Sequence, residues 1–146
     1  MARMEKFIEI KAPPGKVWKI LALDKAVEWM DEMEWERAEY TTEVRTPEDK
    51  YRVGATAHIT EKRWDYDLEI LESLENEKMK VHSIGKYAYT FTFTLRPVDG
   101  GTMLTLEAFL KMPYGILGEF LYKLASGSGE KQVQRALDKL KNIVEE

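Results

Sequence analysis

The chain has 146 residues, of which 44% are hydrophobic and 33% charged, the composition of a folded domain rather than a disordered segment. Its 22 basic and 26 acidic side chains give a net charge of −4, with no basic cluster free of acidic neighbours, so we do not expect a nucleic-acid partner. The absence of cysteine excludes disulfides, thiolate metal sites and cysteine nucleophiles.

No targeting or membrane segment is expected. The first eleven residues alternate charged and apolar side chains, unlike a signal peptide, and no uncharged apolar run is long enough to span a bilayer. The expected location is the cytoplasm. The lack of cysteine and the small number of Asn and Gln, with abundant Glu and Lys, resemble the composition of thermophile proteins.

The first elements are a strand and two short helices. Alternation over residues 4–11 predicts a strand with one wet face, which Pro13-Pro14-Gly15 ends. Proline suits the first turn of a helix, and the apolar spacing over residues 17–21 predicts one. Asp24 is the expected N-cap of a second short helix.

Between residues 34 and 112 the hydrophobic period changes to two, which predicts six further strands. Short turns separate several of them, at residues 46–49, 75–77 and 99–101. The alternating segments are residues 37–44, 53–59, 64–70, 79–84, 87–96 and 104–110.

The rest of the chain predicts a long C-terminal helix with two apolar stripes, one in residues 117–124 and one in residues 133–144. An unbroken helix would rotate the second stripe from the first by roughly 150°. Residues 126–129 read Ser-Gly-Ser-Gly between the two stripes. We infer a kink or break at these glycines, or different packing partners for the two halves.

This order predicts a single α+β domain, residues 1–146, in which a curved seven-stranded antiparallel sheet wraps around the C-terminal helix. Small residues on some strands, such as Ala57 and Ala108, face large aromatics on others. Such a pairing could leave an aromatic-lined cavity, or the aromatics could simply fill the core. Close packing of protein interiors favours the filled core when periodicity alone is considered.

A set of short segments occurs in a recognisable order along the chain: residues 8–21, Asp24, Trp29, Val53-Gly54, Gly100-Gly101-Thr102, residues 137–141 and Glu145. This ordered set resembles the START-like (SRPBCC) superfamily of polyketide cyclases, dehydrases and lipid-transport proteins. The resemblance covers nearly the whole chain, implies the helix-grip fold and favours a deep cavity between sheet and helix.

The polar candidates for chemistry are few. His58 and His82 fall on outward positions and lie too far apart in sequence for a known metal-binding spacing, so no metal or other cofactor is predicted. Asp65, Asp67 and Glu69 alternate with apolar residues, as expected of a solvated strand face. Glu61 is predicted to lie near a strand end, as a surface residue or at the pocket mouth.

The leading hypothesis is therefore a protein that binds or carries a small hydrophobic ligand, lipid-like or polycyclic. One alternative is a cyclase- or dehydratase-like enzyme that uses an acid from Glu61, Tyr66 or Tyr89; another is a protein-interaction module without a ligand. The oligomeric state is not predicted. The expected ligand-binding residues, with Trp29 closing one end, are Trp29, Trp64, Tyr66, Tyr89, Phe91, Phe93, Leu106, Leu117, Leu121 and Leu124.

Overall fold

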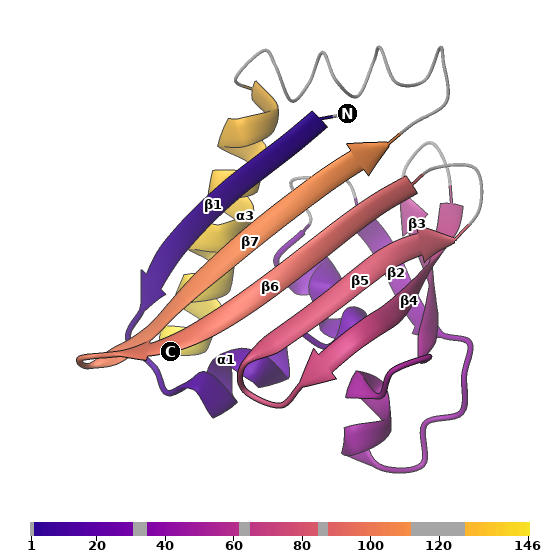
Figure 1. Cartoon of the computed structure of the whole chain (residues 1–146), viewed down its shortest axis with the longest axis horizontal. Coiled ribbons are helices and arrows are strands. Elements are labelled where there is room, and N and C mark those ends of the chain that lie inside the picture. Colours follow the sequence, from indigo (N-terminus) through magenta and orange to yellow (C-terminus); the bar gives the residue numbers. More distant parts are fainter. Residues whose placement is uncertain (1, 31–34, 62–64, 85–87, 112–127) are drawn as a thin grey trace.

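The computed structural model describes residues 2–30, 35–61, 65–84, 88–111 and 128–146. Its seven strands form one antiparallel sheet in the spatial order β1-β7-β6-β5-β4-β3-β2 (Figure 1). Strands that follow one another from β2 to β7 are neighbours, and β1 joins the edge beside β7. The strands are β1 (Ala2–Ile10), β2 (Trp35–Tyr40), β3 (Thr56–Glu61), β4 (Asp65–Leu74), β5 (Lys78–Ile84), β6 (Ala88–Val98) and β7 (Gly101–Lys111).

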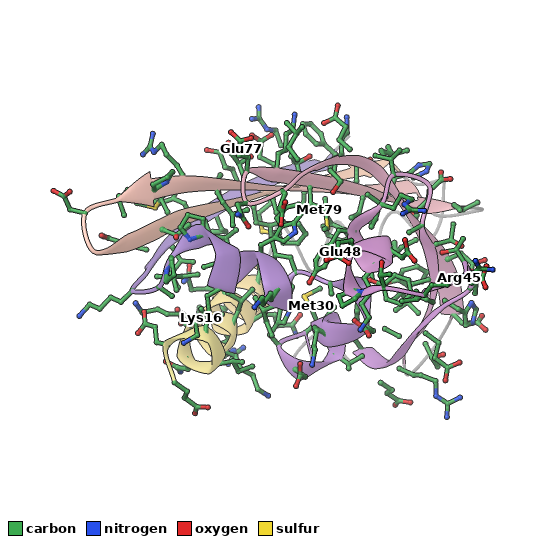
Figure 2. All side chains as sticks on the ribbon, turned by 90° about the horizontal axis from the view of Figure 1, so that it is seen from below. Lys16, Met30, Arg45, Glu48, Glu77 and Met79 are labelled. Atoms are coloured by element: carbon green, nitrogen blue, oxygen red, sulfur yellow. The ribbon has the colours of Figure 1, made fainter. Side chains whose placement is uncertain are left out.

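Three of the described helices cover one face of the sheet. These are α1 (Pro14–Ile20), the 3-10 helix η1 (Leu23–Glu28) and α3 (Ser128–Glu145), which runs behind β1 and β7 in Figure 1. The edge-on view of Figure 2 shows Met79 of β5 extending from the sheet into the interior and Met30 approaching from the helical side. The α+β helix-grip arrangement predicted from the sequence is confirmed. No helix in the described part of the chain is long and apolar enough to cross a bilayer.

The alternation of apolar residues places one face of each strand in the core. On β4, Leu68 and Ile70 are almost fully buried, while Asp65 on the same strand is exposed to solvent. The apolar stripe of α3 closes the core from the other side, with Leu137 and Leu140 fully buried. The second of the two predicted helical stripes therefore packs on the sheet; the first, in residues 117–124, lies outside the described residues.

Three boundary predictions were wrong for identifiable reasons. Asp24 is not an N-cap: η1 begins one residue earlier, and the Asp24 carboxylate instead pairs with Lys50 at 2.7 Å. The segment predicted to begin at Val53 becomes a strand only at Thr56, because Gly54 adopts a φ of 91° that interrupts extended backbone. The strand predicted over residues 37–44 ends at Tyr40. The Thr41 N–H still donates to the Thr56 carbonyl at 2.9 Å, but Thr56 is the first residue of β3, so the strand pairing goes no further.

The segment predicted as a turn at residues 46–49 is part of a second 3-10 helix, η3 (Pro47–Tyr51). Its first turn is closed by the Asp49 carboxylate, which accepts hydrogen bonds from the backbone N–H groups of Arg45 and Thr46 at 2.9 and 3.1 Å. These bonds lower the pKa of Asp49 below its usual range. The residues that predicted a turn, 46–49, therefore form the start of a 3-10 helix instead.

The Tyr40 hydroxyl joins η3 to the first helices. It accepts a hydrogen bond from the Leu23 N–H at 3.0 Å and donates one to the Lys50 carbonyl at 2.9 Å. Burial raises the pKa of Tyr40 far above its ordinary value, so the hydroxyl remains a donor at any physiological pH. One side chain on the edge strand β2 therefore ties together two segments that are 27 residues apart.

Tyr40→Phe is expected to lower the free energy of unfolding by about 1–3 kcal/mol, because it leaves a backbone donor and a backbone acceptor without their partner. The matched control is Tyr51→Phe, which removes a single, more exposed hydrogen bond to the Lys19 carbonyl and should cost less. Urea denaturation of both variants measures the difference. Equal stability of Tyr40→Phe and the wild type would contradict the bridging role.

Candidate functional site

A cavity lies between the sheet and the helical layer. The space open to the centre of a water molecule is about 50 Å³, several times the roughly 10–15 Å³ that one water needs on that measure. Every described lining residue is apolar. They are Met4, Leu21, Leu23, Ala26, Trp29, Met30, Trp35, Leu68, Val81, Phe91, Phe93, Leu106, Ala108, Phe109, Val133 and Ala136.

Strand register explains the sheet wall of the cavity. Cross-strand pairing joins four residues on neighbouring strands into one inward-facing row. Val81 of β5 pairs with Phe91 of β6, Phe91 pairs with Ala108 of β7, and Ala108 pairs with Met4 of β1. A small residue in this row, Ala108, stands between larger neighbours and leaves room above it. The small residue Ala108, noted in the sequence, therefore does meet a large aromatic, Phe91, across strands.

The opposite wall is formed by the α1–η1 region, which lies between β1 and β2 in the chain, together with α3. Leu21 and Leu23 lie at the α1–η1 junction, and Val133 and Ala136 lie one turn apart on α3. Their spacing of three residues places them on the same helical face. The cavity thus has a sheet wall and a helical wall, each contributed by several elements.

Aromatic contacts hold part of the lining in fixed positions. Trp29 meets Phe93 edge to face, with ring centroids 6.0 Å apart, and Trp35 meets Tyr66 in the same way at 6.2 Å. The Trp29 indole N–H donates to the Ile20 carbonyl at 3.3 Å. The polar edge of Trp29 is therefore engaged by protein backbone rather than available to a ligand.

Four of the ten predicted ligand-binding residues lie together around the cavity: Trp29, Phe91, Phe93 and Leu106. Tyr66 is buried beside them, against Trp35, but does not line the space. Tyr89 lies in β6, and its side chain is outside what the structure describes, as is that of Glu61. Trp64, Leu117, Leu121 and Leu124 lie outside the described residues.

Trp35 is a lining residue that the sequence pattern did not reveal. If the strand alternated regularly, the even-numbered residues Tyr40 and Ala38 would face the core and Trp35 would face solvent. A β-bulge between Trp35 and Arg37 shifts the register, so that Trp35 turns inward and is 6% exposed. Val133 and Ala136 were visible as part of a buried stripe, but nothing in the spacing singles them out as cavity residues.

The outer face of the sheet carries the polar candidates. His58 Nδ1 lies 2.8 Å from a carboxylate oxygen of Asp67, and Nε2 lies 3.2 Å from one of Asp65. His82 Nε2 lies 2.8 Å from Glu69. The outward placement predicted for these residues is confirmed. Within the described ranges, no group of three His, Asp or Glu side chains is arranged so that it could hold a metal ion.

The Asp67 carboxylate, followed by that of Asp65, raises the pKa of His58 above 6.5. The stabilisation by protonated His58 is complete below pH 6.5 and is lost as the pH rises through the higher folded-state pKa. Asp67→Asn should therefore lower the NMR titration midpoint of His58, whereas Asp138→Asn on the exposed side of α3 should leave it unchanged. A midpoint that does not move in Asp67→Asn would show that this contact does not persist in solution.

Sheet, helices and cavity together define a helix-grip protein with an apolar internal site. A family model described as polyketide cyclase/dehydrase and lipid transport matches residues 1–145. The chain belongs to this family, which confirms the resemblance inferred from its sequence. Comparison with curated proteins gives no significant match.

Solved structures with the same fold cover nearly the whole chain. Protein CV1439 from Chromobacterium violaceum is 18% identical, with a TM-score of 0.68, over 100% of this chain and 99% of its own. Protein MLL2253 from Mesorhizobium loti is 20% identical, with a TM-score of 0.69, over 98% and 96%. The Aha1 dimer from Colwellia psychrerythraea is 17% identical, with a TM-score of 0.66, over 99% and 97%. At these identities the likeness concerns the fold alone.

Proposed function

We propose that this chain is a cytoplasmic binding or carrier protein for a small hydrophobic molecule held in the cavity between sheet and helices. The observation that carries the proposal is the lining itself, whose described residues combine aromatic rings, flexible methionines and aliphatic side chains and offer water few hydrogen-bond partners. Transfer of apolar ligand surface into such a site is worth about 25 cal/mol per Å² before the cost of association is subtracted.

The same lining argues against the enzyme alternative. A cyclase or dehydratase needs an acid or base within hydrogen-bond reach of its substrate. No acid, base or hydroxyl occurs among the lining residues that the structure describes. Of the residues considered for that role, Tyr66 is buried beside Trp35 rather than on the cavity surface.

The interaction-module alternative has less support than the carrier. It requires a filled core and a large exposed apolar patch. The interior instead contains a cavity. Of the exposed large apolar side chains in the described part of the chain, Leu71 and Leu74 share β4, and Phe7 on β1 is separated from them by three strands.

The test is to identify what the purified protein binds. Native mass spectrometry followed by extraction should detect a retained apolar compound. Titration with the neutral fluorescent probe N-phenyl-1-naphthylamine should give saturable binding and quench the fluorescence of Trp29 and Trp35, which both line the cavity. Absence of a retained compound together with non-saturable probe fluorescence would contradict the proposal.

A further inference from the structure

The part of the cavity wall that the structure describes offers a ligand almost no polar partner. Within the sixteen described lining residues, the side-chain heteroatoms are the indole nitrogens of Trp29 and Trp35 and the sulfurs of Met4 and Met30. The Trp29 nitrogen already donates to the Ile20 carbonyl. Thioether sulfur is only a weak acceptor and cannot donate.

A charged ligand group would therefore lose its water without gaining a counter-ion from this wall. Desolvation without a partner strongly disfavours the ionised form of a carboxylate and favours its neutral acid. An uncharged ligand of the same shape makes the same apolar contacts without that cost.

Two described lysines on the helical side of the molecule are engaged with other groups. Lys141 of α3 contacts Glu145 at 2.6 Å and donates to the Glu9 carbonyl at 2.9 Å, and Lys16 donates to the Glu146 carbonyl at 3.2 Å. On the sheet wall, Lys6 is paired with Leu106 and shares the inward parity of Met4, but it is not a lining residue. Lys6 is thus the residue to control for in any test with an anion.

We infer that the cavity discriminates by charge, accepting uncharged aromatic or alicyclic molecules and rejecting their carboxylates. This inference rests on the proposed ligand-binding function and adds the class of ligand to it. It predicts that neutral compounds such as alcohols, ketones or hydrocarbons are carried, whereas ionised fatty or aromatic acids are not.

The test compares 2-naphthalenemethanol with 2-naphthoate, which share one ring system and differ in charge. Each is titrated against the full chain at pH 7 and pH 6 by displacement of N-phenyl-1-naphthylamine. The alcohol should bind at least tenfold more tightly than the acid at pH 7, with an affinity that is equal at both pH values. The apparent affinity of the acid should rise about tenfold from pH 7 to pH 6, because its neutral fraction rises tenfold per unit well above its pKa.

The alcohol also controls for titration of the protein itself, including His58 on the outer face. Lys6→Gln should change neither affinity. Equal binding of alcohol and carboxylate at pH 7 would overturn the inference and leave the proposed function intact; loss of that carboxylate binding in Lys6→Gln would identify the cation responsible and would still overturn it. Failure of the probe and both compounds to bind would overturn the inference together with the proposed function.

Discussion

Ala136→Phe is expected to weaken binding of N-phenyl-1-naphthylamine at least tenfold while the protein remains folded. Ala136 is 1% exposed and lies on the face of α3 that lines the cavity, so an added ring enters the empty space rather than solvent. Filling a cavity with apolar atoms restores lost packing contacts, and such substitutions commonly raise stability by about 0.5–2 kcal/mol. Ligand and side chain then compete for one volume.

The measurement is a fluorescence titration accompanied by thermal unfolding of each variant. Asn142→Phe is the matched control, because it adds the same ring to an exposed position of the same helix and should leave the affinity unchanged. Ala108→Leu approaches the space from the sheet side and should also weaken binding. Wild-type affinity in both cavity variants, with their folds intact, would place the ligand elsewhere.

Gly101→Ala is expected to destabilise the fold by about 3 kcal/mol or more. Gly101 begins β7 at the hairpin with β6, directly beside the end of β1. A Cβ atom at this position would overlap the carbonyl oxygen of Ile10, which is backbone and cannot rotate away. The strand pairing between β1 and β7 would have to open locally, where Thr102 Oγ1 also donates to the buried Ala12 carbonyl at 2.7 Å.

Gly15→Ala provides the contrasting substitution. A Cβ atom there would lie 3.7 Å from Asn76 Oδ1, an ordinary contact, and Gly15 lies within α1. Alanine is the better helix former, so this variant should be as stable as the wild type or more stable by up to about 1 kcal/mol. Guanidinium denaturation of both variants distinguishes them. A Gly101→Ala protein of wild-type stability would mean that β1 does not approach β7 this closely in solution.

The sheet could be predicted because its signal is local. Strict alternation on β4 and β6 reports which side chains face the core, and the short turns between strands impose antiparallel neighbours. Strand ends were less predictable, since they depend on a partner: the last backbone bond of this pairing joins Thr41 to Thr56, the first residue of β3. The Gly54 conformation that delays β3 is likewise invisible in a hydrophobic pattern.

The fold class, the inward faces of the strands and the apolar stripe of α3 could be inferred from the sequence, because they follow from side-chain periods of two and about 3.6. Tertiary structure alone decided that Trp35 turns inward at a bulge, and that Ala108 and Ala136 stand on opposite walls of one space. It also decided between a filled core and a cavity. A void remains only where the space between the curved sheet and the helix exceeds the summed volume of the side chains that fill it. Those side chains come from many elements, and no local sequence pattern encodes the distance between sheet and helix.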